Sequence, residues 1–393
     1  MSIKEGYNDK SIRCNGIKRR SFLASVTAAI AGMTLLPTQA SCQQSNPVAA
    51  INDSATAKEI DAFIKKLADE DKFSGAVLLA KDDKPIFQKA YGLASKEFNV
   101  PNQINTKFNV ASMGKMFTGV AVAQLAEQGK LSFNDFIGKH LLDYPKDVAN
   151  RVTIHHLLTH TSGLGSYWKD EFHEANHARF RTIQDFFPFF INDAPAFTPG
   201  AKWSYSNAGF MVLGAIIEKV AGQSYFAYVK ENVFRRAGMN DADFYEADRV
   251  TPNLAIGYTK QNRYLREVKE WTNTLFISPV KGGAAGGGYS TVEDLLRFSV
   301  ALRQNKLLSP KMTNTTLTGK FEYAPNRKYA YGFANDIVNG QRIVFHDGGA
   351  NGISAEFDMY LDTGYSIIVL SNYDHPATRP VVKKAQETIS LLL

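Results

Sequence analysis

Cysteine is almost absent from this chain. Its 393 residues include two, Cys14 and Cys42, both near the N-terminus. Nothing further along can pair with them, so a fold held together by disulfides is excluded. A large excess of one charge is absent too, because 45 Lys and Arg stand against 38 Asp and Glu. With 44% hydrophobic and 12% aromatic residues, the chain is too apolar to be disordered and long enough for one large domain or two medium ones.

The excess positive charge is concentrated at the N-terminus. Residues 1–40 carry six Lys or Arg and two Asp or Glu, which leaves about +3 of the formal +7 for the rest of the chain. The basic stripe typical of nucleic-acid-binding proteins is not evident, so no nucleic-acid partner is expected.

The N-terminal segment has the pattern of an export signal. Lys18-Arg19-Arg20-Ser21-Phe22-Leu23 is a twin-arginine motif, and the uncharged, mildly apolar segment Phe22–Pro37 follows it. A membrane span needs ~20 strongly apolar residues, and this segment is shorter and weaker. Residues 1–40 are therefore predicted to be a twin-arginine signal peptide that exports the protein to the periplasm. An amphipathic or buried N-terminal helix is the alternative.

Two kinds of processing fit the end of this segment. Thr38-Gln39-Ala40 supplies the small residues needed for cleavage after Ala40. Gln39-Ala40-Ser41-Cys42 resembles a lipoprotein box, although Gln39 stands where an aliphatic residue is usual. In the second case Cys42 becomes a lipidated N-terminus that attaches the protein to a membrane. Residues 41–56 are small and polar and are predicted to be a linker.

Hydrophobic patterns predict an α+β fold over residues 57–393. Apolar residues recur with a helical period over Ala57–Asp71, and the β-type runs Gly75–Ala80 and Pro85–Tyr91 form a predicted hairpin. Near the C-terminus three β-type runs precede a final helix that begins near Pro380: Arg342–Phe345, Ala355–Leu361 and Tyr365–Leu370. We expect an antiparallel, five-stranded-type sheet flanked by helices and built from both chain ends, at about 57–125 and 286–393. A mainly helical subdomain is expected between them, at about 126–285.

The pattern Ser-x-x-Lys occurs three times, at Ser112/Lys115, Ser166/Lys169 and Ser278/Lys281. So short a pattern also arises by chance, and its local context decides. Ser278 precedes a proline and a glycine run, and Ser166 lies in a loop-like, aromatic-rich stretch. Ser112 alone opens a long apolar helix, predicted over Met113–Gln128.

This placement suits Ser112 to nucleophilic catalysis. A spacing of three puts its hydroxyl and the Lys115 ammonium on one helix face. The helix N-terminus offers free N–H groups and positive potential, which favour an alkoxide and a developing oxyanion. A desolvated lysine can lose its proton and act as a base. The alternative is a capping serine beside a surface lysine.

Two further segments carry groups suited to the same chemistry. Tyr205-Ser206-Asn207 offers a phenol that can shuttle a proton and an amide that can hold a substrate carbonyl; aromatic capping of a loop is the alternative. His346-Asp347-Gly348-Gly349 follows a β-type run. Its glycines let a substrate approach the backbone and offer an N–H as an oxyanion donor, and His346 could hydrogen-bond or protonate the Tyr205 oxygen. Lys281-Gly282-Gly283 has the same pattern, a basic residue two positions before a glycine, and competes with His346-Asp347-Gly348 for this role. It lies in a loop and is less suitable.

Together these motifs resemble the serine β-lactamase and penicillin-binding-protein superfamily. The resemblance is to the branch of class C β-lactamases, D-Ala-D-Ala carboxypeptidases, D-aminopeptidases and related esterases, and it runs from about Lys58 to Leu393. It also includes three segments in the family's order and spacing: Thr153-Ile154-His155-His156-Leu157-Leu158-Thr159-His160-Thr161-Ser162-Gly163-Leu164, Phe197-Thr198-Pro199-Gly200 and Gly286-Gly287-Gly288-Tyr289-Ser290-Thr291.

The resemblance implies a role for each site residue. Ser112 is the acylated nucleophile, Lys115 its base and Tyr205 the general acid and base. Asn207 binds the substrate carbonyl, and the N–H groups of Ser112 and Gly349 form the oxyanion hole. His346, Asp347, Gly348 and Gly349 also contact the substrate. His346-Asp347-Gly348 stands where β-lactamases carry Lys-Thr-Gly, and Asp347 is the more unusual departure.

The predicted function is that of an acyl-serine hydrolase without a cofactor or metal. Its substrate would be a small molecule or peptide with a peptide, amide or ester bond, and a D-amino-acid peptide or small ester is favoured over a β-lactam. A class C-like β-lactamase is one alternative, and a non-catalytic penicillin-recognition or sensor protein is another. The oligomeric state is not predicted.

Two other motifs are weaker candidates for a site. His156 and His160 are four residues apart and could share a helix face as metal ligands, but no Glu lies between them. The glycine run Gly282–Gly288 lacks the Lys-Ser/Thr of a phosphate-binding loop and is predicted to be a flexible connection.

Overall fold

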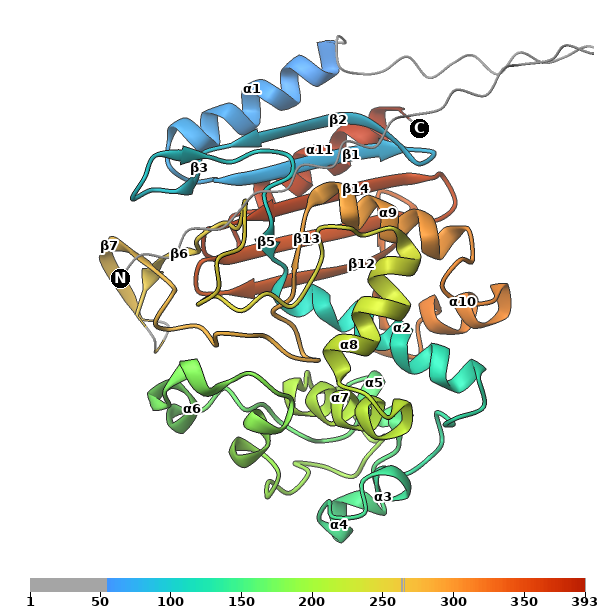
Figure 1. The fold of residues 1–393 in the computed structure, drawn as a ribbon. Coiled ribbons are helices and arrows are strands. Elements are labelled where there is room, and N and C mark those ends of the chain that lie inside the picture. Colours follow the sequence, from blue (N-terminus) through green and yellow to red (C-terminus); the bar gives the residue numbers. More distant parts are fainter. Residues whose placement is uncertain (1–54, 263, 265, 393) are drawn as a thin grey trace, which may run out of the picture. The chain divides into compact units, whose positions relative to one another are not determined.

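The computed structural model describes residues 55–262, 264 and 266–392 (Figure 1). The predicted signal peptide and Cys42 lie outside these residues, as does the predicted linker except for Ala55 and Thr56, which already belong to a helix. In the part of the chain that is described, no helix is long and apolar enough to cross a membrane.

The centre of the fold is an eight-stranded antiparallel sheet with the order β2-β1-β14-β13-β12-β11-β10-β9. Figure 1 shows the blue strands from the beginning of the chain beside the red ones from its end. The predicted α+β fold, with an antiparallel sheet built from both chain ends, is confirmed. The strands are β1 (Gly75–Lys81), β2 (Lys84–Tyr91), β9 (Phe321–Ala324), β10 (Arg327–Tyr329), β11 (Ala334–Val338), β12 (Gln341–Ala350), β13 (Ile353–Tyr360) and β14 (Tyr365–Ser371).

The sheet is wider than the five strands expected. The five from β2 to β12 are present, and β11, β10 and β9 continue the sheet beyond β12. These added strands have three to five residues each. Runs as short as these show too little alternation to be recognised as strands from hydrophobic pattern.

Each face of the sheet is covered by helices. Side chains alternate along a strand, so Val77 and Leu79 pack with α1 (Ala55–Asp69) and α11 (Arg379–Leu392) in one apolar core. Ala76 and Leu78 face the opposite core, which α2 (Gly114–Glu127), α9 (Val292–Arg303) and α10 (Pro310–Leu317) help to form. Because an apolar core covers each face of the sheet, the central strands β13 and β14 are buried along their whole length.

The remaining helices lie between the two halves of the sheet in sequence. They are α3 (Ile137–His140), α4 (Lys146–Ala149), α5 (Ile154–Leu158), α6 (Asp170–Glu174), α7 (Asn207–Ala221) and α8 (Tyr225–Val229), with single turns or short segments at 177–179, 184–189 and 230–235. Helix α7 ends at Gly222, which adopts the left-handed conformation (φ +67°) common after a helix. Three short strand pairs complete the fold: β3 (Leu93–Ser95) with β4 (Val100–Pro101), β5 (Phe108–Asn109) with β8 (Tyr289–Ser290), and β6 (Tyr258–Gln261) with β7 (Glu267–Asn273).

The β6–β7 hairpin lies within the span, about 126–285, that was predicted to be mainly helical. Most residues of β7 are exposed, so this strand needs no apolar side to face a core. Its sequence, Glu-Val-Lys-Glu-Trp-Thr-Asn, therefore has no hydrophobic alternation that would predict a strand.

Candidate active site

Ser112 lies in a tight turn directly before α2. This 3₁₀ turn, Ala111–Met113, precedes the α-helix, which begins at Gly114. Ala111 has φ +42°, a conformation that costs energy for any residue with a side chain. The Gly287 N–H donates to the Ala111 carbonyl (3.1 Å) and helps to hold this turn. Ser112 thus projects from a constrained backbone rather than from a regular helix.

Strand β12 packs closely against the same turn at Gly348. A Cβ atom at Gly348 would lie 2.3 Å from the Val110 carbonyl oxygen and 3.1 Å from the Ser112 backbone nitrogen. Only glycine permits this approach. Gly349, the next residue, lines the same cavity as Ser112, as a donor to an oxyanion would have to do.

Lys115 is completely buried beside Ser112. Its Nζ lies 3.2 Å from Ser112 Oγ, 2.8 Å from Asn207 Oδ1 and 2.6 Å from the Ala285 carbonyl oxygen. The ring centroids of Tyr205 and Phe210 are 4.7 and 5.4 Å from it. Burial lowers the pKa of Lys115 well below its ordinary value, although the negative charge of Asp347 opposes this shift.

These contacts suit a neutral amine. Asn207 Oδ1 and the Ala285 carbonyl can only accept, so Lys115 donates its two hydrogens to them. A neutral amine then keeps one lone pair, directed at the remaining partner, Ser112 Oγ. Lys115 can therefore accept the Ser112 proton, which is the role of a general base.

Tyr205 stands at the surface of the site, with 37% of its area exposed. Desolvation raises the pKa of its phenol above the ordinary value; a hydrogen bond with Ser112 offsets part of the shift, and the charge of Asp347 adds to it. The phenol is therefore protonated at neutral pH. It contacts the nucleophile and can give a proton to a leaving group.

Asn207 joins Lys115 to a residue whose role the sequence did not indicate. While Asn207 Oδ1 accepts from Lys115, its Nδ2 donates to Ser166 Oγ (3.3 Å). Ser166 belongs to a Ser-x-x-Lys match, but its lysine, Lys169, pairs with Asp193 (2.6 Å) instead. Ser166 thus positions the Asn207 amide.

The segment 153–164 holds the Tyr205 loop in place. His160 is buried and has φ +59°. Its Nδ1 accepts from the Ser206 N–H (3.0 Å), its carbonyl accepts from the Ser204 N–H (2.9 Å), and its ring lies 4.4 Å from the ring of Tyr205. His156 instead caps α5, because its Nδ1 accepts from the Thr153 N–H (3.2 Å). The two histidines therefore hold backbone segments in place: His160 binds the Tyr205 loop, and His156 binds the start of α5.

His346 does not make the contact that was predicted for it. It is 3% exposed, and its Nδ1 lies 2.6 Å from the Asp347 carbonyl oxygen, which can only accept. The proton is therefore on Nδ1, and Nε2 accepts from the Tyr329 hydroxyl (2.9 Å). Burial lowers the pKa of His346 to about 4, against the opposing charge of Asp347. With both nitrogens bonded, the neutral ring does not reach the Tyr205 oxygen in this structure.

Asp347 is exposed and acts on the site through its charge. It lines a cavity together with Tyr205, and its carboxylate is close enough to influence the pKa values of Lys115, Tyr205 and His346. Across the sheet it pairs with Glu356. Along β12, Gly348 faces the Ser112 turn and Gly349 faces His375. Alternation therefore puts the Asp347 side chain on the side of Gly349 and Glu356, next to the start of α11, and not on the side that packs against the turn.

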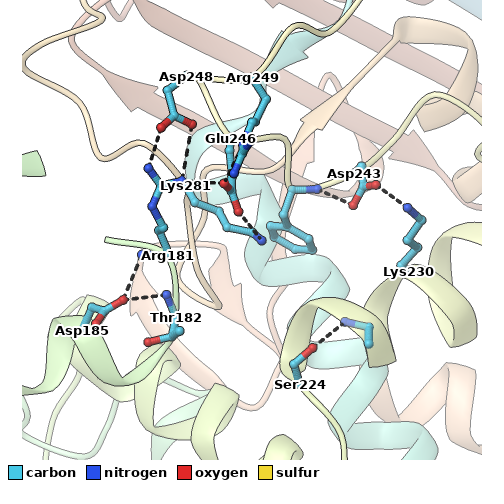
Figure 2. A network of polar contacts seen from close by, with 12 residues as sticks. Arg181, Thr182, Asp185, Ser224, Lys230, Asp243, Glu246, Asp248, Arg249 and Lys281 are labelled. Carbon is cyan, nitrogen blue, oxygen red and sulfur yellow. Dashed lines mark hydrogen bonds and ion pairs between the residues drawn. The ribbon is translucent and has the colours of Figure 1, made fainter. Parts of the chain in front are cut away.

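In the third Ser-x-x-Lys match, as in the second, the lysine pairs with a carboxylate elsewhere in the chain and not with its serine. Lys281 pairs with Glu246 (3.3 Å), which also pairs with Arg181, as Figure 2 shows. This network joins the start of the glycine run to distant segments and occupies the Lys281 ammonium. Ser278 nevertheless lines the Ser112 cavity. The glycine run serves close packing: a Cβ at Gly286 would lie 2.4 Å from the Ala111 carbonyl oxygen.

Ser112 opens into a small cavity of about 100 Å³ with an apolar, aromatic wall. Asn207, Ser278 and Gly349 supply its polar edge, and the wall includes Tyr167, Trp168, Phe186, Pro279, Ala350 and Ile353. A cleft of this kind suits an acyl group with an apolar side chain.

The fold and the site together define a class of protein. A serine at the start of a buried helix, a lysine desolvated beside it and a tyrosine facing both, next to an antiparallel sheet, are the parts of the β-lactamase and transpeptidase-like serine hydrolases. The family model described as Beta-lactamase matches residues 60–389, and the chain belongs to this family.

Individual relatives agree with this assignment. Penicillin-binding protein 4* of Bacillus subtilis is 30% identical over 347 residues, which cover 84% of this chain and 75% of that protein. The crystal structure of a penicillin-binding protein from Bacillus halodurans superimposes with a TM-score of 0.75 at 33% identity, covering 84% of this chain and 98% of the other. The crystal structure of a D-stereospecific amidohydrolase from Streptomyces sp. superimposes with a TM-score of 0.71 at 26% identity, covering 85% of this chain and 98% of the other. The predicted superfamily is therefore confirmed.

Proposed function

We propose that this protein is an exported serine hydrolase that forms an acyl-enzyme on Ser112 and cleaves a peptide, amide or ester bond. The observation that carries the proposal is the contact of the buried Lys115 amine with Ser112 Oγ at 3.2 Å. The family and its D-stereospecific amidohydrolase relative support a hydrolase. The export signal rests on the twin-arginine motif.

The reaction follows from these contacts in two stages. Lys115 takes the Ser112 proton while Oγ attacks the substrate carbonyl, and the oxyanion forms beside the N–H groups of Ser112 and Gly349. Tyr205 gives its proton to the departing oxygen or nitrogen as that bond breaks, and is reprotonated through Lys115. Water then attacks the ester carbonyl and gives a proton to Lys115 and Tyr205. The bond between that carbon and Ser112 Oγ breaks as Oγ takes this proton back, and the acid is released.

A D-amino-acid peptide or small ester is the favoured substrate. β-Lactams carry a carboxylate, and the structure offers it a neutral His346 and a negative Asp347 instead of a cation and a hydroxyl. The class C-like β-lactamase is the second candidate because the family bears that description. A sensor that binds penicillin without turnover would not need Ser112, Lys115 and Tyr205 together.

Covalent labelling of single variants tests the mechanism. Ser112→Ala should lose all labelling by a fluorophosphonate and all turnover. Lys115→Arg replaces the neutral amine by a cation that cannot lose its proton, so it should slow acylation by about 10³-fold. A panel of D-amino-acid peptides, short-chain esters and a chromogenic cephalosporin identifies the bond that is cleaved.

Ser166→Ala provides the matched control. It should remain fully labelled, because the side-chain hydrogen bonds of Ser166 within the described residues join it to the Asn207 amide and the Trp168 N–H and not to Ser112 or Lys115. Its turnover should fall by less than about tenfold. Full labelling of Ser112→Ala would refute the assignment of the nucleophile. Labelling without turnover of any substrate would favour the sensor.

A further inference from the structure

A second cavity, of about 430 Å³, is lined by Tyr205 but not by Ser112 or Asn207. It lies between the Tyr205 loop, strands β10 to β12 and the start of α11. The size is that of a small-ligand site. Besides Tyr205, the lining residues that matter here are Trp203, Tyr323, Tyr329, Arg327, Asp347 and Arg379.

Aromatic rings form one wall of this cavity. Trp203 stacks on Tyr323 with centroids 4.8 Å apart, and the Tyr205 and Tyr329 rings each lie 6.3 Å from that of Trp203. Tyr329 is fixed by its hydrogen bond to His346. The faces of such rings attract cations, most strongly when several rings surround one position.

The charged groups of the cavity differ in what they already bind. Arg327 pairs with Asp336 (2.8 Å) and Arg379 with Glu356 (2.7 Å). Both guanidinium groups thus direct donors at carboxyl groups of the sheet. Asp347 is exposed, and among the described residues no hydrogen bond or ion pair of its carboxylate is found. Asp347 is therefore the carboxylate of this lining that is left to receive a ligand.

We propose that this cavity binds the leaving group of the substrate and selects one that carries a positive charge, such as a primary or quaternary ammonium. The inference rests on the proposed function, in which Tyr205 protonates the leaving atom and so faces the part of the substrate that departs. The ring faces and the Asp347 carboxylate attract a cation and disfavour a carboxylate. The acyl part occupies the apolar cavity at Ser112.

Three esters with one acyl group and different alcohols test the selection. The alcohols are choline, its uncharged isostere 3,3-dimethylbutan-1-ol and the anionic 4-hydroxybutyrate, and each kcat/KM is divided by the rate of hydroxide-catalysed hydrolysis. The wild type should favour the choline ester about tenfold over the isostere and the isostere over the anion. Equal values for choline and isostere, or a preference for the anion, would overturn the proposal.

Two variants separate charge from fold. Asp347→Asn keeps the shape and should reduce the preference for choline to about twofold, the part that the rings supply. Asp362→Asn removes an exposed carboxylate from the turn between β13 and β14, outside the lining residues, and should keep the preference. Loss of preference in both variants would assign it to net charge and contradict a site at Asp347.

Binding to the Ser112→Ala protein is independent of catalysis. Calorimetry with choline and with 3,3-dimethylbutan-1-ol should give a Kd for choline at least tenfold lower, and Asp347→Asn should remove the difference. This result without turnover of any ester, amide or peptide of the panel would refute the proposed hydrolase and keep the cation site. Turnover on Ser112 with equal Kd values would keep the hydrolase and refute the cation site.

Discussion

A single buried amine determines what Ser112 can do. Lys115 has no exposed surface, and its three polar neighbours are oxygens. Desolvation favours the uncharged amine, which is the form able to take a proton. The amine donates its two hydrogens to Asn207 Oδ1 and the Ala285 carbonyl oxygen, so its lone pair is free to accept the proton of Ser112. The reactivity of the site thus follows from burial and from the direction of hydrogen bonds.

Asp347 adds the charge that distinguishes this site from a β-lactamase. We predict that Asp347→Thr raises kcat/KM for a carboxylate-bearing lactam by about fivefold and leaves a neutral ester within twofold. Two anions ~4 Å apart repel by roughly 4 kcal/mol at an effective dielectric near 20. Because Asp347 is exposed, solvent screening reduces this to about 1 kcal/mol. Equal effects on the two substrates, or efficient hydrolysis of penicillin by the wild type, would contradict this role.

At the scale of secondary structure, the site depends on how closely β12 lies against the Ser112 turn. Gly348 permits that approach, and Gly286 permits the approach of the glycine run from another direction. The turn is thereby held between two backbone segments far from it in sequence. This contact keeps Ala111 in its left-handed conformation.

Gly348→Ala should therefore impair both stability and activity. Its Cβ would lie 2.3 Å from the Val110 carbonyl oxygen, so β12 or the turn must move. We expect a loss of about 1–3 kcal/mol of unfolding free energy and at least a 100-fold fall in kcat/KM, measured by urea unfolding and ester hydrolysis.

Gly340→Ala is the control on the same strand pair. Gly340, unlike Gly348, has a positive φ, +76°, and a Cβ there would meet nothing within 4 Å. It should cost about 1 kcal/mol of stability through backbone strain alone and keep kcat/KM within twofold. A Gly348→Ala enzyme with wild-type activity would show that close packing of β12 is not needed.

For the molecule as a whole, buried ionisable groups make stability depend on pH. Burial, with the charge of Asp358 adding to it, raises the pKa of Glu356 to about 8, and Arg379 opposes the shift. Because the pKa in the folded state is above that of the unfolded chain, the stabilisation from Glu356 is complete below about pH 4.5 and is lost as the pH rises through 8. His346, with its pKa lowered to about 4, has the opposite sign: its stabilisation is complete above about pH 6.5 and is lost on acidification.

Glu356→Gln tests the alkaline side of this balance. The variant cannot ionise, so its unfolding free energy should fall by roughly 2 kcal/mol less than that of the wild type between pH 5 and 8. Urea unfolding at several pH values measures this. Glu322→Gln, at an exposed carboxylate of β9, should follow the wild type. Parallel curves for Glu356→Gln and wild type would mean that Glu356 is ionised throughout this range.

Export is also a property of the whole chain. We predict that Arg19→Lys combined with Arg20→Lys retains the protein in the cytoplasm, because twin-arginine signals are read by a receptor rather than by charge. Arg13→Lys, outside the motif, should be exported normally, and cell fractionation distinguishes the two. Normal export of the double variant would contradict the signal. Incorporation of labelled palmitate that is lost in Cys42→Ser would show lipidation.

The sequence by itself determined features that depend on neighbouring residues. The spacing of Ser112 and Lys115 along one helical turn, the β-type run Gly75–Ala80 and the glycines beside His346 are local features, and each predicted its element. The family's order of motifs then associated Tyr205, Asn207 and Gly349 with the same site. Segments far apart in sequence could be grouped in this way without any distance being known.

Only the tertiary structure decided how the side chains meet. Ser166 contacts Asn207 across 41 residues, and Tyr329 binds His346, which was expected to hydrogen-bond or protonate the Tyr205 oxygen. The direction of Asp347 and the complete burial of Lys115 likewise depend on segments remote in sequence. Hydrophobic pattern reports which side of an element is apolar, whereas a hydrogen-bond partner and a shifted pKa are set by whatever the fold brings into contact.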